Sequence, residues 1–210
     1  MVASDLGVQS AKELDGAAVC TQSGTTSELN LSDYFRINNM TYDAAVFDSP
    51  EQSIAGFEAG RCDVLSSDAS QLYAQRIQLA DPNMAVVLPE IISKEPLGPA
   101  VRQGDDQWFN IVKWSLFAML NAEELDVSQA NVDEQLSSDN PDVMRLLGQD
   151  GDFGEAMGLQ PDWAYQIVKQ VGNYADIYDR NVGTESDFNI ARGLNALWND
   201  GGIQYAPPIR

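Results

Sequence analysis

The sequence predicts an α/β unit with a mainly parallel sheet, followed by a helical unit. Up to about residue 96, short apolar runs alternate with helical patterns of about 10–15 residues, which is typical of strands joined by crossover helices. After Pro96 the pattern becomes almost entirely helical, and all four tryptophans lie there. We therefore expect two domains, over residues 1–96 and 97–210.

The first unit is expected to contain four strands and three helices. Hydroxyl residues at 25–27 and the pair Ser49-Pro50 can begin two of the helices, and Gly60 can end the second. Residues 1–16 show no buried run and are expected to form a connector into the first strand. The expected strands cover 17–21, 42–47, 62–65 and 84–88, and the expected helices cover 25–38, 49–59 and 68–77.

The second unit is expected to begin with an extended piece at Leu97–Val101. Asp105 and Asp106 can then start a long amphipathic helix that runs to about residue 125. A pair of glycines, Gly201-Gly202, stops the last helical pattern. The other expected helices cover 128–136, 140–147, 152–157, 162–181 and 190–199.

Charge and composition exclude several classes of function. The chain carries 12 Lys and Arg against 32 Asp and Glu, a formal net charge of −20. A surface this acidic repels nucleic-acid backbones and anionic lipid. Because there is no His, neither Ser-His-Asp nor Cys-His catalysis is available, and there is no imidazole metal ligand. Two cysteines cannot form a four-cysteine zinc site, and we expect no metal or other cofactor.

No segment has the pattern of a membrane span or a leader peptide. The longest apolar stretch, Trp114–Leu120, is too short to cross a bilayer. Residues 1–16 lack the basic start and the apolar run of a signal peptide. Either the chain is intracellular or a leader has been removed, and the connector-like start favours the second alternative.

The first candidate binding loop is Gln22-Ser23-Gly24-Thr25-Thr26, between the first strand and its helix. Free N–H groups at a helix start, with two threonine hydroxyls, can bind an anion such as a carboxylate. The alternative is that Ser and Thr only cap the helix, which is their commoner role. The spacing is not that of a P-loop.

The second candidate is Ser66-Ser67-Asp68, at the end of the third strand. If the strand order is 2-1-3, this segment and Ser23-Gly24 lie together, where open α/β sheets bind ligands. An anion site beside the carboxylate of Asp68 matches a zwitterion, with the ligand's ammonium on Asp68. Taken alone, Asp68 fits a helix N-cap better. The two segments together are a more specific indication of a binding site than either one alone.

The two cysteines, Cys20 and Cys62, lie on strands expected to be neighbours. A disulfide across this separation of 42 residues is attractive for stability. If the strand ends align, however, the two cysteines are offset by about 10 Å, which is too far for a bridge. Both possibilities, a disulfide and two buried free thiols, therefore remain. Other acidic groups, such as Glu123-Glu124, show no metal-ligand spacing, and we assign them no catalytic role.

Several long segments resemble the general L-amino-acid-binding periplasmic proteins of ABC uptake systems. The resemblance extends over nearly the whole chain, and it implies a type II periplasmic binding fold, in which two α/β lobes close over one amino acid. The segments that carry it are VCTQSGTTSELNLSDYFRINNMTYDAAVF, GRCDVLSSDASQLYAQR, VVLPEIISKEPLGPAVRQGDDQWFNIVKW, VGNYADIYDRNVG and ARGLNALWNDGGIQYAPPIR.

The resemblance also implies roles for individual residues. Gln22–Thr26 correspond to the carboxylate-binding loop of the second lobe, and Asp68, preceded by Ser67, to the acidic residue that holds the ligand's α-amino group. The stretch EPLGPAV resembles the return hinge strand. On this basis residues 1–96 are the second lobe, and residues 97–210 are the hinge strand plus the helical part of the first lobe.

What the chain lacks, by this resemblance, is the N-terminal part of the first lobe. We therefore expect a truncated periplasmic protein that binds L-amino acids weakly, through their shared backbone, and whose family partners are membrane permease subunits. Helices rich in Trp and Phe without a sheet to cover suggest self-association, for example as a homodimer. The alternatives are an interaction module with a vestigial site and, less favoured, an enzyme of the dehydratase or transglycosylase type on the same fold.

Overall fold

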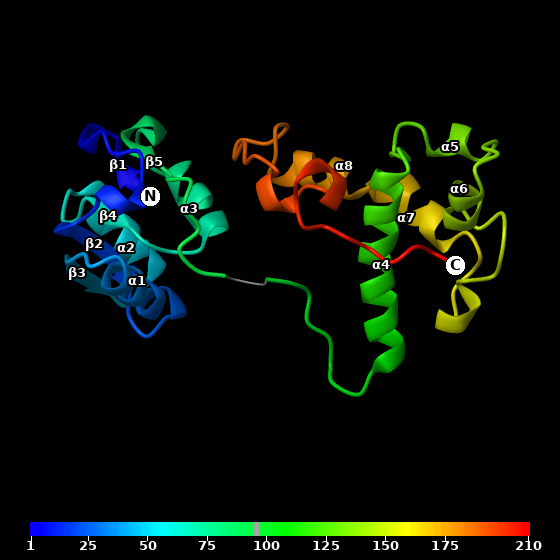
Figure 1. Ribbon diagram of the computed structural model, residues 1–210, viewed down its shortest axis with the longest axis horizontal. Helices are drawn as coiled ribbons and strands as arrows, with labels where there is room; N and C mark the ends of the chain where they lie inside the picture. Colours follow the sequence, from blue (N-terminus) through cyan, green and yellow to red (C-terminus); the bar gives the residue numbers. More distant parts are fainter. Residues whose placement is uncertain (95–96) are drawn as a thin grey trace. The chain divides into compact units, whose positions relative to one another are not determined.

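The computed structural model describes residues 1–94 and 97–210, which divide into two compact units, Met1–Leu97 and Gly98–Arg210 (Figure 1). Each unit has its own buried core. Glu95 and Pro96, which the resemblance places in the return hinge strand, lie outside the described residues. Residues 97–101 form no strand, and Pro99 has no N–H to donate to one.

The first unit is built on a five-stranded sheet with the strand order β3-β2-β4-β1-β5. β2 pairs in parallel with β3 and β4, whereas β1 pairs antiparallel with both β4 and β5. Four strands therefore run in one direction, which confirms the α/β class with a mainly parallel sheet. The first three expected strands are β2, β3 and β4, and their order β3-β2-β4 is the expected 2-1-3 order. The strands are β1 (Val2–Ala3), β2 (Ala17–Gln22), β3 (Tyr42–Phe47), β4 (Val64–Leu65) and β5 (Ala85–Val86).

The start of the chain does not form the expected connector. Met1 and Val2 are 6% and 1% exposed, because β1 is inserted between β4 and β5. The amino group of Met1 donates a hydrogen bond to Leu65 O at 2.9 Å, and burial lowers its pKa to about 5. A two-residue strand is too short to be recognised from apolar periodicity, which explains the wrong expectation.

Three helices cover the two faces of this sheet. They are α1 (Thr26–Ile37), α2 (Pro50–Glu58) and α3 (Ala69–Arg76). Successive residues of β2 point to opposite faces, so Val19 packs with α1 residues, whereas Cys20 packs with residues of α2 and α3. The α1 residues are Leu31 and Phe35, and the residues on the other face are Phe57 and Leu72.

The second unit is helical and is organised around its longest helix, α4 (Asp106–Glu124). Ala118 and Ala122 of α4 face the larger core, whereas Leu120 packs in a smaller cluster with Leu197. The helix therefore buries residues on two sides. The remaining helices are α5 (Val132–Gln135), α6 (Pro141–Leu146), α7 (Trp163–Val171) and α8 (Tyr174–Asn181).

Three helical predictions in this unit need correction. The expected helix over 162–181 is two helices, because Gly172 adopts φ 91°, which favours glycine and interrupts α7. The segment 152–157 forms only the short 3₁₀ turn η4 (Glu155–Met157). The segment 190–199 forms two such turns, η5 (Gly193–Asn195) and η6 (Trp198–Asp200), and Gly193 also has a positive φ.

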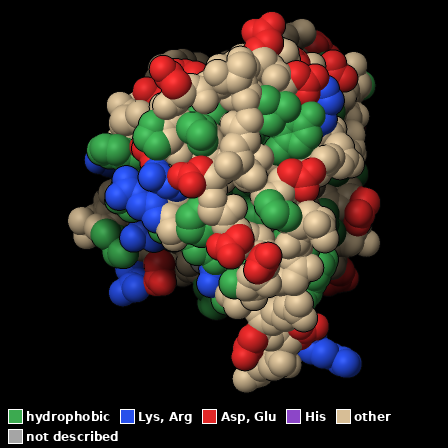
Figure 2. All heavy atoms as spheres, turned by 90° about the vertical axis from the view of Figure 1, so that its right-hand side faces the viewer, with side chains coloured by type: hydrophobic (Ala, Val, Ile, Leu, Met, Phe, Trp, Pro, Cys, Tyr) green, Lys and Arg blue, Asp and Glu red, His purple; other side chains and the backbone are tan. Residues whose placement is uncertain are grey.

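The acidic character of the sequence is visible on the surface. Figure 2 shows Asp and Glu side chains spread over the face instead of gathered in one patch. Within the described ranges, no helix combines the length and the apolar content that crossing a membrane requires.

Candidate functional site

The two candidate segments leave the sheet side by side. In the register of β2 and β4, Val19 lies opposite Val64 and Cys20 lies opposite Leu65. The pairing continues one step further, since Ser66 N donates to Cys20 O at 3.0 Å. The residues that follow each strand therefore emerge at the same edge of the sheet, at its carboxyl end.

The loop after β2 is held by its own hydrogen bonds. Gly24 has φ 69°, a left-handed conformation that turns the chain into α1. The Thr25 hydroxyl donates to Gln22 O at 2.8 Å and accepts from Glu28 N at 3.3 Å, as an N-cap does. Ser23 N donates to Phe47 O at 2.8 Å, which ties the loop to β3. Capping is thus one established role of this loop.

A carboxylate already lies in this loop. Gly24 N donates to Glu28 Oε2 at 2.8 Å. The predicted anion site therefore accommodates a carboxylate, but in this structure it is an internal one. Glu28 is not among the site residues expected from the sequence, although Thr25 followed three residues later by Glu is the pattern of a capping box, which points to it. The side chain of Thr26, at the first position of α1, is exposed.

Asp68 is placed at the neighbouring helix start. It is the N-cap residue of α3, but its side chain accepts no capping hydrogen bond, in contrast to Thr25 and Ser49 at the starts of α1 and α2. Ser67 donates its hydroxyl to Gln71 Oε1 at 2.6 Å and so is engaged within α3. The half-buried Asp68 carboxylate has no hydrogen-bond or ion-pair partner in the described ranges, which leaves it available to a cation.

A disulfide lies beneath this edge. Cys20 and Cys62 are bonded, with their Cα atoms 5.7 Å apart. The offset calculated from the sequence does not apply, because Cys62 precedes β4 and lies in the turn that follows α2, not in the paired strand. Both cysteines are buried in the core between the sheet and α2.

Two acidic residues at the end of α4, Glu123 and Glu124, have structural partners. Arg192 donates to both carboxylate oxygens of Glu123, at 2.8 and 3.1 Å, and Trp198 Nε1 donates to Glu124 at 3.2 Å. Desolvation raises the pKa of Glu123, even though Arg192 opposes this shift. Among the residues that the structure describes, no group of three or more Cys, Asp or Glu side chains is arranged to hold a metal ion.

Comparisons with known proteins show which proteins this chain is related to. The chain is 58% identical to the general L-amino acid-binding periplasmic protein AapJ of Rhizobium johnstonii, over its whole length and 62% of AapJ. It is 48% identical to the glutamate/glutamine/aspartate/asparagine-binding protein BztA of Rhodobacter capsulatus, again covering 62% of that protein. The chain is homologous to periplasmic amino-acid-binding proteins of ABC transporters.

A solved structure of this homologous group has the same fold. It is an ABC transporter periplasmic binding protein from Brucella ovis with glutathione bound, 51% identical, with a TM-score of 0.91 over all of this chain and 66% of that one. The periplasmic-binding-protein-like fold predicted by the resemblance is therefore confirmed for the part present. The chain spans less than two thirds of the length of these relatives. No protein-family model matches it.

Proposed function

We propose that the first unit contributes half of an amino-acid-binding site. In this proposal Gln22, Ser23, Gly24, Thr25 and Thr26 hold the carboxylate of an L-amino acid, and Asp68, beside Ser67, holds its α-ammonium group. The observation that carries the proposal is the Asp68 carboxylate, which lacks a capping hydrogen bond and lies one strand away from the Gly24 loop.

The charge pattern of this edge supports a zwitterionic ligand. The N-terminus of α1 presents a partial positive charge, and the contact between Gly24 N and Glu28 is an example of a carboxylate in that position. Asp68 provides a negative charge on the neighbouring strand end. A ligand with both charges on one carbon can satisfy the two groups together, so recognition falls on the backbone and leaves the side chain free to vary.

The names of the relatives fit this ligand class. AapJ and BztA are named for amino acids, and the Brucella ovis protein was solved with glutathione, whose glutamyl end carries a free α-amino and α-carboxylate group. We extend the proposal to a periplasmic solute-binding component that delivers its ligand to the permease subunits of an ABC transporter. It acts by binding and release and not as an enzyme.

Blocked ligands test the two halves of the proposal separately. In an NMR titration, L-alanine should shift the amide signals of residues 23–26 and 66–68, with a dissociation constant in the millimolar range. N-acetyl-L-alanine lacks the ammonium and L-alaninamide lacks the carboxylate, so each should shift these signals less at equal concentration. Equal responses to all three compounds would contradict zwitterion recognition.

A second proposal concerns self-association of the helical unit. At the start of α4, Trp108 and Phe109 are 52% and 49% exposed, which is unusual for adjacent aromatic residues. We propose that this end of α4 mediates a homodimer. Light scattering should show a mass that rises with concentration and falls in a Trp108→Ser variant, whereas a clean monomer at high micromolar concentration would contradict the proposal.

A further inference from the structure

A cavity of about 470 Å³ lies within the second unit, formed by residues of that unit alone. Its size is in the range of small-molecule sites. It is lined by residues of α4, the loop before η4, η4 itself, the start of α7 and the last residues of the chain. Neither the proposed amino-acid site nor the proposed dimer contact uses it.

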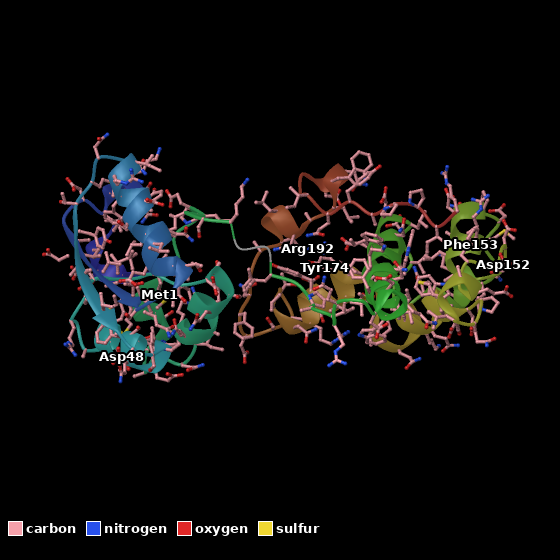
Figure 3. All side chains as sticks on the ribbon, turned by 90° about the horizontal axis from the view of Figure 1, so that it is seen from below. Met1, Asp48, Asp152, Phe153, Tyr174 and Arg192 are labelled. Atoms are coloured by element: carbon pink, nitrogen blue, oxygen red, sulfur yellow. A yellow bond between two sulfur atoms is a disulfide. The ribbon has the colours of Figure 1, made fainter. Side chains whose placement is uncertain are left out.

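Three aromatic rings form the walls of this cavity. Trp114 comes from α4 and Trp163 from the first position of α7. Phe153, labelled in Figure 3 next to Asp152, comes from the loop between α6 and η4. Trp163 is only 9% exposed, so its ring is held by the core. The Phe153 ring lies against Gly151, where an added Cβ would approach it to 2.3 Å. Two of the walls are therefore fixed by close packing.

Two free carboxylates lie on the same lining. Asp152 and Glu155 are exposed, and in the described ranges neither side chain has a hydrogen bond or an ion pair. Arg210 is the one basic residue of the lining, so acidic groups remain in excess. The rest of the unit adds to this negative charge, since residues 98–210 carry 18 Asp and Glu against 7 Lys and Arg.

We propose that this cavity binds a small organic ammonium ion with an apolar body, such as a trimethylammonium compound. The faces of aromatic rings, tryptophan above all, attract cations, and the two carboxylates supply the opposite charge. An anion would be repelled by Asp152 and Glu155. A metal ion would need more oxygen ligands than this lining offers.

Choline and its neutral isostere, 3,3-dimethylbutan-1-ol, test the charge requirement directly. Choline should change the tryptophan fluorescence saturably, and the neutral alcohol should bind about tenfold more weakly or not at all. Equal binding of the two would overturn the proposal in favour of a merely apolar pocket. The absence of a saturable response to choline would overturn it altogether.

Variants locate the binding in this cavity. Asp152→Asn should weaken choline binding several-fold, whereas Asp139→Asn, an equal charge change at an exposed position outside the lining, should not. Phe153→Leu should also weaken it, with the urea midpoint confirming that the variant is folded. Equal effects of Asp152→Asn and Asp139→Asn would contradict the assignment. Phosphatidylcholine vesicles separate a free solute from a lipid headgroup, and co-sedimentation of the chain with them would overturn a small-solute site.

Discussion

Loss of the contact between Arg192 and Glu123 should strongly destabilise the helical unit. The guanidinium donates to both oxygens of Glu123 and, from Nε and Nη2, to Asn195 O at 3.2 and 3.0 Å. It also lies 5.2 Å from the ring centres of Tyr174 and Tyr178. Figure 3 labels Arg192 and Tyr174, which lie close together. This one side chain thus joins α8, the end of α4 and the segment that leads into η5.

The magnitude follows from what Arg192→Met would leave behind. The side chains of Arg192 and Glu123 are only 21% and 14% exposed, so the variant leaves a largely buried carboxylate without its partner. Breaking a fully buried pair costs about 3–5 kcal/mol, and partial exposure reduces this cost. Each lost cation–π contact adds about 0.5–1 kcal/mol. We expect a loss of about 3 kcal/mol in the free energy of unfolding.

Urea unfolding followed by tryptophan fluorescence is the suitable assay. All four tryptophans lie in residues 98–210, so the signal reports on the helical unit only. Arg102→Met is the matched control, because it removes the same charge from an exposed position. In a double-mutant cycle with Glu123→Gln, the effects should be non-additive. A loss equal to that of Arg102→Met, or strict additivity with Glu123→Gln, would refute the reasoning.

Three further predictions concern the first unit. The Met1 amine has a pKa of about 5 in the folded chain against 8.0 when free, so the unfolded state binds more protons between these two pH values. The free energy of unfolding should therefore fall by about 4 kcal/mol from pH 8 to pH 5. Acetylation of the N-terminus removes the titrating amine and should abolish this pH dependence. Reduction of the Cys20–Cys62 disulfide should cost about 4 kcal/mol for a loop of this length, and a urea midpoint of the unit that does not change with reductant would contradict this. Glu28→Gln should weaken the cap on Gly24 by about 1 kcal/mol and strengthen binding of L-alanine, because the competing carboxylate is gone; unchanged affinity would show that Glu28 does not compete.

The parts of the fold that the sequence predicted well have strong local signals. β2, β3 and the helices after them combine apolar runs with hydroxyl caps, and α2 is also followed by a glycine, Gly60. These elements lie where expected. β1 has two residues and is defined only by its neighbours in the sheet. The break at Gly172 was missed because the apolar pattern continues through it into α8.

The candidate site was predicted in position but not in its internal contacts. Strand order brought the loop at Gly24 and the N-cap at Asp68 to one edge, and a simple topological rule suffices for that. The contact from Glu28 to Gly24 and the missing cap on Asp68 depend on side-chain conformations, which spacing does not determine. The sequence does not distinguish a disulfide from two free thiols, because the expected offset holds only if Cys62 lies within the paired strand, and Cys62 precedes β4.

The affinity of an Asp68→Asn variant for L-alanine tests the central claim most directly. Asp63→Asn is the control, since Asp63 is an exposed carboxylate five residues earlier, whose backbone alone is hydrogen-bonded in the described ranges. If Asp68 holds the ligand's ammonium group, Asp68→Asn should lower the affinity by about tenfold or more, as expected for a charge-assisted hydrogen bond, while Asp63→Asn should leave it unchanged. Equal affinities for wild type, Asp68→Asn and Asp63→Asn would contradict the claim.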